Sequence, residues 1–375
     1  MHRYFPRGSD SARLGAQPAD PLGRGSSARR TTKPTGPVMP LPPPISVIIP
    51  AYNAATHIGE ALASVAGQGG GFRLEVIVVD DGSTDATREQ VAAFDLAVGT
   101  GLAPAPVAGC RDGGGPLQMR LIAQANAGPA AARNRGIRAA TGELIAFLDA
   151  DDRWPADRLR VQVPILAQFP RVGLVFGDCR GFDARGERAL TQFETDGLDL
   201  GFWGAPVLVE DPYGKLLRNN FIPTGAVLAR KDALLAVGLF DESRRLVEDL
   251  DLWLRLALHC PFAYTREVCE LKRTHGANCS ADRDAMALAY IEVLRDQARR
   301  VPGALRRRGL RVAPLMAFEY CLIGDRREGR GDRVGARGAY AAALRTSPSL
   351  RPLYYWLRTW LRGRDAGQAP PRGRT

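Results

Sequence analysis

The sequence holds three tight groups of acidic residues, each at a point where an ordered element is expected to begin or end. They are residues 80–85 (DDGSTD), residues 149–152 (DADD) and residues 247–251 (VEDLD). Carboxylates this close together repel one another unless a cation or hydrogen-bond donors offset their charge. Such groups can bind a divalent metal, accept hydrogen bonds from a ligand or remove a proton from a hydroxyl.

The first group follows an apolar, β-branched run, residues 74–79 (LEVIVV), which predicts a buried strand. Carboxylates just past a strand, such as Asp80 and Asp81, can accept hydrogen bonds from a nucleobase or from ribose hydroxyls. The alternative is a helix cap built from the serine and threonine that come next. Two adjacent carboxylates before Gly82 exceed what a cap needs, so we favour the ligand interpretation.

The second group follows another apolar run, residues 144–148 (LIAFL), and carries three carboxylates in four residues. A hard divalent cation is the natural partner for that charge, and diphosphate oxygens would complete its coordination. We therefore predict Mn²⁺ or Mg²⁺ as cofactor. The alternative is a solvated acidic turn that caps the next helix, which is all that Asp152 need do.

The third group begins an amphipathic helix predicted over residues 250–258. Glu248 or Asp249 is placed to take a proton from an attacking hydroxyl. Acidic residues are also common in the first turn of a helix, where they interact favourably with the helix dipole. This group alone therefore does not distinguish a catalytic base from an ordinary helix start.

Around these groups the hydrophobic pattern predicts alternating strands and helices. Expected strands are residues 45–49, 74–79, 121–122, 144–148, 172–176 and 226–229, and expected helices are residues 57–66, 130–140, 250–258, 336–345 and 353–361. Strand–helix–strand units feed a parallel sheet, so the fold class is α/β, with a mostly parallel central sheet flanked by helices. The glycine-rich residues 99–119 are expected to be an inserted surface loop.

Charge and composition divide the chain into three predicted parts. Residues 1–44 form a disordered leader rich in Pro and Arg, residues 45–280 a catalytic domain, and residues 281–375 a basic helical extension. Residues 1–44 carry a net charge of +5 and residues 295–375 carry +13, which leaves −7 for residues 45–294 of a chain at +11. An acidic middle argues against a nucleic-acid partner.

The cysteines and the hydropathy pattern exclude several other classes. The six cysteines show neither a CxxC pair nor zinc-ligand spacing, so we expect free thiols. The phosphate-binding patterns GxxxxGK[ST] and GxGxxG are also absent. No apolar run is long enough to span a membrane, and the first residues lack a secretory pattern, so we expect a cytoplasmic protein.

Four motifs together resemble family 2 glycosyltransferases of the Rossmann-like GT-A fold. They are residues 46–53 (SVIIPAYN), 78–85 (VVDDGSTD), 124–152 (QANAGPAAARNRG to LDADD) and 248–255 (EDLDLWLR). Their order and spacing are specific as a set, and the resemblance spans roughly residues 45–280. It implies a nucleotide-sugar donor, a divalent cation and an inverting transfer without a covalent intermediate.

The resemblance also assigns roles to individual residues. It places at the nucleotide sugar Pro50, Ala51, Tyr52, Asp80, Asp81, Asn126, Arg133 and Asp149. Asp151 matches the metal-binding aspartate of a DxD motif, and Asp249 the catalytic base, with Glu248 as its neighbour. His275 lies in a segment that resembles one closing over the diphosphate, where it is either a metal ligand or bonded to a local partner. The alternative for Tyr52 is an aromatic ring that only packs against its neighbours. The alternative for Arg133 and for Asn126 is a solvated side chain without a ligand role.

We predict transfer of a sugar to a glycan or lipid-linked acceptor in cell-surface polysaccharide or glycolipid synthesis. The alternative is a non-catalytic sugar-nucleotide-binding or scaffold protein of polysaccharide assembly. Arginines around Trp356 and Trp360 suggest peripheral contact of the last helix with anionic lipid at the inner face of the membrane. Short polar loops over residues 177–225 are expected to select the sugar, whose identity the sequence does not reveal.

Overall fold

A computed structural model describes residues 43–68, 70–99, 117–275 and 282–364 of the chain. The predicted leader lies almost wholly outside these residues, as does most of the predicted insertion at 99–119. The described residues belong to one compact unit.

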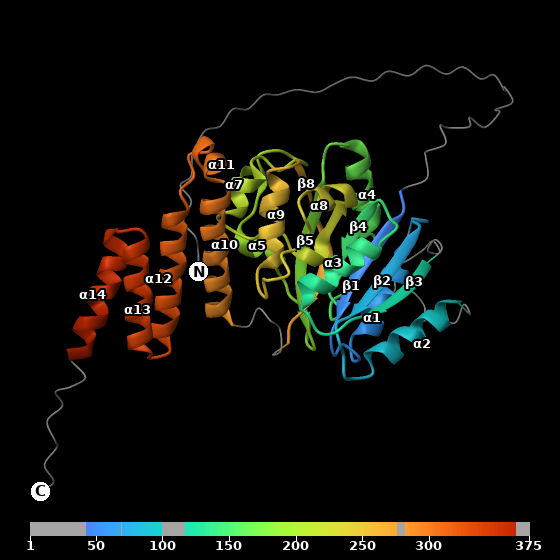
Figure 1. Ribbon diagram of the computed structural model, residues 1–375, viewed down its shortest axis with the longest axis horizontal. Helices are drawn as coiled ribbons and strands as arrows, with labels where there is room; N and C mark the ends of the chain where they lie inside the picture. The colour runs from blue at the N-terminus through green and yellow to red at the C-terminus, as the bar shows by residue number, and fades with distance from the viewer. Residues whose placement is uncertain (1–42, 69, 100–116, 276–281, 365–375) are drawn as a thin grey trace, which may run out of the picture. The chain divides into compact units, whose positions relative to one another are not determined.

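The strands form a mixed sheet of eight strands within the described residues (Figure 1). In chain order they are β1 Ile45–Ala51, β2 Leu74–Asp80, β3 Leu117–Ala123, β4 Leu144–Phe147, β5 Leu174–Asp183, β6 Gly186–Glu187, β7 Val227–Arg230 and β8 Phe262–Arg273. Their order in the sheet is β3-β2-β1-β4-β7-β5-β6, and β8 pairs with β5. The α/β class and the mostly parallel sheet are thus confirmed.

Strand direction decides where a site can form. Strands β1 to β4 run parallel, β7 is antiparallel to both β4 and β5, and β8 is parallel to β5. All strands except β6 and β7 therefore end at the same edge of the sheet. Ligands of α/β sheets collect at this edge, because loops and helix N-termini there present unpaired backbone groups.

Helices cover both faces of this sheet (Figure 1). Their bounds are α1 Ile58–Ala66, α2 Thr87–Gly99, α3 Pro129–Ala139, α4 Arg158–Gln168, α5 Gln192–Asp196, α6 Leu200–Trp203, α7 Pro212–Leu216, η1 Thr224–Ala226, α8 Lys231–Ala236, α9 Glu248–Ala257, α10 Arg283–Arg300, α11 Pro302–Arg307, α12 Val312–Gly329, α13 Arg333–Thr346 and α14 Leu350–Arg364.

Alternating residues of each strand pack into two separate cores. On β1, for example, Ile48 contributes to the core shared with α3 and α9, whereas Val47 and Ile49 contribute to the core shared with α1 and α4. All three side chains are fully buried. Because both faces are covered, the strands read as continuous apolar runs, and that is why the sequence revealed them.

Strand β1 extends beyond the predicted residues 45–49, because Pro50 does not end it. The strand continues to Ala51, which pairs with Asp80 of β2. The carbonyl of Ile48 accepts a hydrogen bond from the backbone of Leu148, so the alternate residue Pro50 turns its nitrogen to the same side. The β4 ladder has already ended there, so the missing N–H of proline costs no sheet hydrogen bond.

Three further expectations are corrected by the structure. Strand β8 was not predicted, and residues 117–119, assigned to the insertion, pair with β2 as the start of β3. Residues 177–225 are not mainly polar loops, since they include the rest of β5 and three short helices around buried aromatic rings. The Trp203 indole, fully buried, stacks on Tyr264 with ring centroids 4.4 Å apart.

The C-terminal helices form the predicted extension, but the first of them shares the main core. Val293 and Leu294 of α10 are fully buried in the core that also holds Trp253 of α9. Cys179, Cys260, Cys269 and Cys321 are free thiols, as expected, and the other two cysteines lie outside the described residues. Among the described helices, none is both long and apolar enough to span a membrane.

Glycines in two helices give a matched test of the packing. A Cβ on Gly136 of α3 would lie 2.5 Å from Cγ2 of buried Ile48, whereas a Cβ on Gly338 of α13 meets nothing within 4 Å. We expect Gly136→Ala to lower the free energy of unfolding by about 1–3 kcal/mol through overpacking. Gly338→Ala should raise it by about 0.5–1 kcal/mol through helix propensity. Urea unfolding measures both, and equal effects would contradict the packing described.

Candidate active site

The end of β2 carries two carboxylates that organise the neighbouring loops. Asp81, 4% exposed, accepts hydrogen bonds of 2.8 Å each from Nε2 of Gln124 and from the backbone N–H groups of Ala127 and Gly128. These bonds fix the segment that leads into α3. Asp80 is fully buried and pairs with Arg88 at 2.5 Å.

The loops after β1 and β2 are tied together beside these carboxylates. Asn53, in the left-handed region at φ 49°, donates its backbone N–H to Ser83 Oγ and accepts from the backbone of Thr84, both at 2.9 Å. Gly82 has φ +81°, and a Cβ there would lie 2.9 Å from the backbone nitrogen of Asn126. The side chains of Tyr52, 54% exposed, and Asn126 remain open to solvent at this edge.

The loop after β4 turns its three carboxylates toward three different partners. Asp149 Oδ1 accepts from Arg133 at 2.7 Å, Asp151 Oδ2 lies 2.9 Å from Nε2 of His275, and Asp152 Oδ1 accepts from the backbone of Arg273 at 2.6 Å. Two of these partners belong to the end of β8 and the residues just after it. Sequence spacing alone had grouped the three aspartates as one metal cluster.

Arg133 joins the second and third acidic groups. Its side chain, 6% exposed, donates 2.7 Å hydrogen bonds to both Asp149 and Glu248, and it lies over the ring of Phe240. Burial opposes the guanidinium charge, but the two carboxylates outweigh it and raise the pKa of Arg133. The solvated alternative for this arginine is therefore wrong.

The pKa values of the two carboxylates that Arg133 binds are shifted in opposite directions. Burial alone would raise the pKa of Asp149, but Arg133 and Lys272 hold it below the ordinary value. For Glu248 burial prevails over Arg133, and with Asp249 adjacent the pKa of Glu248 is raised. The bridge thus joins an ionised aspartate to a glutamate that protonates more readily.

A second set of buried charges supports the β4 loop from beneath. Asp152 and Glu270 of β8 are 2% and 1% exposed. Burial, with repulsion from Glu270 and Asp149, raises the pKa of Asp152 to about 10, and burial likewise raises the pKa of Glu270. Burial therefore favours the protonated form of each of these two carboxyl groups. Lys272, beside both carboxylates, has its pKa raised because their attraction outweighs its desolvation.

Asp151 and His275 form the pair best suited to a cation. Their side chains are 31% and 34% exposed, and the His275 ring stacks near His57 with centroids 6.1 Å apart. Burial and the nearby Arg273 lower the pKa of His57, which favours neutral imidazole. Within the described residues no three His, Cys, Asp or Glu side chains converge on one metal position. A cation here would draw its remaining ligands from substrate or water.

Asp249 stands at the start of α9, and polar side chains from another segment hold it. Its Oδ2 accepts from Asn220 Nδ2 at 3.2 Å and from Thr224 Oγ1 at 3.3 Å, and its Oδ1 accepts from the backbone of Leu250 at 2.7 Å. Val247 before the helix has φ 58°, a strained conformation for a β-branched residue. No signal in the sequence singled out Asn220 or Thr224.

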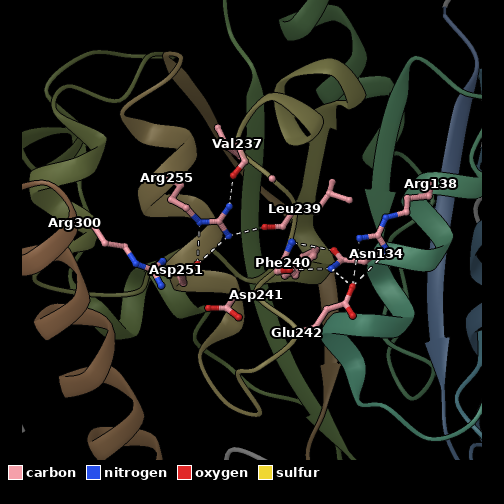
Figure 2. A pocket seen from close by; sticks show the side chains of 11 residues that line it. Asn134, Arg138, Val237, Leu239, Phe240, Asp241, Glu242, Asp251, Arg255 and Arg300 are labelled. Atoms are coloured by element: carbon pink, nitrogen blue, oxygen red, sulfur yellow. Dashed lines mark hydrogen bonds and ion pairs between the residues drawn. The ribbon is translucent and has the colours of Figure 1, made fainter.

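Arg255, in the last turn of α9, anchors this helix to neighbouring segments (Figure 2). Arg255 donates to the fully buried Asp251 and to the carbonyls of Val237 and Leu239. A cavity of about 440 Å³ lies here, and its lining includes Asp251 but neither Glu248 nor Asp249. Asp251 therefore belongs to the helix anchor, although the sequence grouped it with the candidate base.

Comparisons with known proteins agree with the resemblance to glycosyltransferases found in the sequence. The profile of the family described as Glycosyl transferase family 2 matches residues 46–225. An uncharacterized glycosyltransferase of Nostoc sp. is 29% identical over 66% of this chain and 72% of that protein. The succinoglycan biosynthesis protein ExoO of Rhizobium meliloti is 33% identical over 58% of this chain, and the match spans only 56% of that relative's length.

A solved structure shares the fold. A mannosyltransferase of Pyrobaculum calidifontis, in complex with GDP-Man and Mn²⁺, has a TM-score of 0.54 at 22% identity, covering 91% of this chain and 85% of that one. Fold and sequence together define a glycosyltransferase with the GT-A architecture. Residues 46–225 match the profile of glycosyl transferase family 2, in agreement with the resemblance found in the sequence.

Removing the Arg133 bridge should destabilise the fold. We expect Arg133→Met to lower the free energy of unfolding by about 3–5 kcal/mol near pH 7, because it leaves two carboxylates without their partner. The folded pKa of Asp149 lies below the ordinary aspartate value of 3.8. The stability that this shift contributes is present above that value and is lost as pH falls through the folded pKa. The difference in free energy of unfolding between the wild type and Arg133→Met should therefore become smaller below about pH 4.

The matched control for this variant is Arg135→Met, because Arg135 is exposed on the same helix. It should change stability by no more than about 0.5 kcal/mol. Urea unfolding of both variants from neutral to acid pH makes the measurement. Equal stabilities of the two variants at pH 7 would contradict a structural role for the bridge.

Proposed function

We propose that this glycosyltransferase moves a sugar, with inversion, from a nucleotide-diphosphate sugar to an acceptor hydroxyl. The observation that carries the proposal is the Arg133 bridge between Asp149 and Glu248. The bridge holds the start of α9, with its candidate base, beside the loop that carries the DxD aspartates. Donor activation and acceptor deprotonation would then occur next to each other.

Asp249 is the proposed base. Its carboxylate would accept the proton of the acceptor hydroxyl as that oxygen attacks the anomeric carbon from the side opposite the nucleotide. Hydrogen bonds from Asn220 and Thr224 orient the carboxylate without neutralising it. Glu248, held by Arg133, would keep the first turn of α9 in position.

The nucleotide is proposed to lie at the ends of β1 and β2. Pro50, Ala51 and the exposed Tyr52 would border the base, and Asp80 and Asp81 would lie beside the base and ribose. The hydrogen bonds of Asp81 to the segment before α3 support a rigid floor for that ligand. Asp149 is proposed to face the ribose, and exposed Asn126 the rest of the donor.

Asp151 and His275 are the proposed protein ligands of a divalent cation, Mn²⁺ or Mg²⁺. A carboxylate oxygen and an imidazole nitrogen 2.9 Å apart, both about one-third exposed, suit a cation that keeps several exchangeable ligands. When bound, such a cation would neutralise the diphosphate of the departing nucleotide. The mannosyltransferase that shares this fold was crystallised with Mn²⁺ and GDP-Man, which supports the choice.

The acceptor is proposed to be a glycan or a lipid-linked glycan in polysaccharide or glycolipid assembly at the cytoplasmic side of the membrane. The support is a relative named for succinoglycan biosynthesis.

The cation site can be tested by binding as well as by activity. We expect Asp151→Ala to weaken Mn²⁺-dependent binding of UDP or GDP, followed by calorimetry, by at least about tenfold. The control is Asp157→Ala, because the Asp157 side chain is 73% exposed. Unchanged nucleotide and Mn²⁺ binding in Asp151→Ala would contradict the assignment.

The base can be tested separately from donor binding. Asp249→Asn should bind nucleotide within about twofold of the wild type, yet slow transfer by about 10²–10⁴-fold, because an amide cannot accept the proton. Reversal of the Asn220 amide, whose Oδ1 has no hydrogen-bond partner among the described residues, would accommodate the new NH₂ group. The assay offers a panel of nucleotide sugars and acceptors and follows released nucleoside diphosphate.

The control for the base is Asp232→Asn. Asp232 lies in the first turn of α8, and its carboxylate accepts from the next backbone N–H at 2.7 Å, as that of Asp249 does. The Asp232→Asn variant should keep full transferase activity. Full turnover by Asp249→Asn would exclude this base, and a wild type that binds donor but transfers to no acceptor would favour the scaffold alternative.

A further inference from the structure

The last helix carries an apolar face on each side. Tyr355 and Trp356 of α14 pack on the core formed by α12 and α13, and the Tyr355 ring stacks on Tyr340 with centroids 5.5 Å apart. Buried Pro352 and Thr359 lie on the same side. Trp356 therefore faces inward, and the Trp360 side chain lies outside what the structure describes.

The outward side of α14 is apolar as well. Leu350, Leu353, Tyr354 and Leu357 are 83%, 38%, 61% and 46% exposed. Their spacing of three, four and seven residues places them along one face of the helix. We call these four residues the outer apolar face. Exposed large apolar side chains scattered singly are ordinary, but a continuous row on one helix indicates an interaction surface.

The charge around this face has one sign. Residues 333–364, which span α13 and α14, hold seven arginines and no acidic residue. Arg351 at the start of α14 and Arg345 at the end of α13 are exposed. Arg358 pairs with Glu328 of α12. A basic helix with an apolar face fits an anionic surface that also accepts apolar side chains.

A second copy of this chain fits the face less well. Pairing two outer apolar faces would bring together two sets of arginines, with no carboxylate on α13 or α14 to offset them. An anionic bilayer supplies both the opposite charge and an apolar layer. Since none of the described helices can span a membrane, contact would be at the bilayer surface.

We propose that the outer apolar face of α14, flanked by its arginines, binds the surface of an anionic lipid bilayer. The side chains of Leu350, Leu353, Tyr354 and Leu357 insert at the boundary between headgroups and acyl chains, while arginines contact lipid phosphates. The inference does not depend on the proposed catalytic residues, since α14 lies outside that site.

The test is flotation of the full chain with vesicles of phosphatidylcholine, with and without phosphatidylglycerol. We expect flotation only with phosphatidylglycerol, and release as salt rises from about 0.1 M to about 1 M, because the Debye length falls from about 10 Å to about 3 Å. No flotation with the anionic vesicles, or equal flotation with both kinds, would overturn the proposal.

Paired variants distinguish the contribution of the outer apolar face to vesicle binding from the effect of a change in net charge. Leu353→Glu combined with Leu357→Glu should reduce vesicle affinity at least about tenfold, since it places carboxylates against anionic lipid. The matched control is Leu96→Glu with Leu235→Glu, because those leucines are 69% and 49% exposed on other helices and the charge change is the same. Circular dichroism checks that both variants fold.

The outcomes decide between lipid and a second copy. Loss of flotation in the α14 variant alone supports the lipid surface. Equal flotation of the α14 variant and the wild type overturns it, as does equal loss in the control. Light scattering without vesicles follows the oligomeric state. A wild-type dimer that becomes a monomer in the α14 variant, without vesicle binding by either, would assign the face to a second copy.

Discussion

The arrangement of the site depends on one buried guanidinium. Arg133 is the only described side chain that bonds both to the loop after β4, at Asp149, and to the first turn of α9, at Glu248. Two carboxylates brought together without it would repel each other in a poorly solvated space. Arg133 attracts both carboxylates and so offsets their repulsion. Its two hydrogen bonds also fix the distance between the loop after β4 and the first turn of α9.

Other carboxylates at the same edge of the sheet are also stabilised by nearby cationic side chains and backbone hydrogen bonds. Lys272, itself exposed, attracts the buried carboxylates of Asp152 and Glu270, and the backbone of Arg273 bonds to Asp152 while its side chain reaches the carbonyl of Asp151. The DxD loop is therefore held on β8 from below and on α3 from the side. Asp151 is thus left facing His275, with both side chains still accessible to solvent.

The sequence predicted the parts whose signal is local. Strands such as β1 and β2 are apolar runs, and the aspartates follow them directly, so class, sheet and candidate residues were accessible. Strand β8 was missed because charged residues, among them Glu267 and Lys272, interrupt its apolar pattern. The pairing of Arg133 with Glu248 spans 115 residues, and no local pattern encodes a partner at that separation. Asn220 and Thr224 reach Asp249 in the same non-local way.

The position of α10 has a consequence for how this chain can vary. Val293 and Leu294 complete the core that also packs around Trp253 of α9, and Arg244, which precedes α9, pairs with Asp296 of α10. A chain cut before α10 would expose that core to water beneath the helix that bears the candidate base. Leu305 of α11 and Val312 of α12 belong to the same core, so only α13 and α14 could be exchanged for other modules without exposing it, and a boundary for recombination lies inside the extension and not at its start.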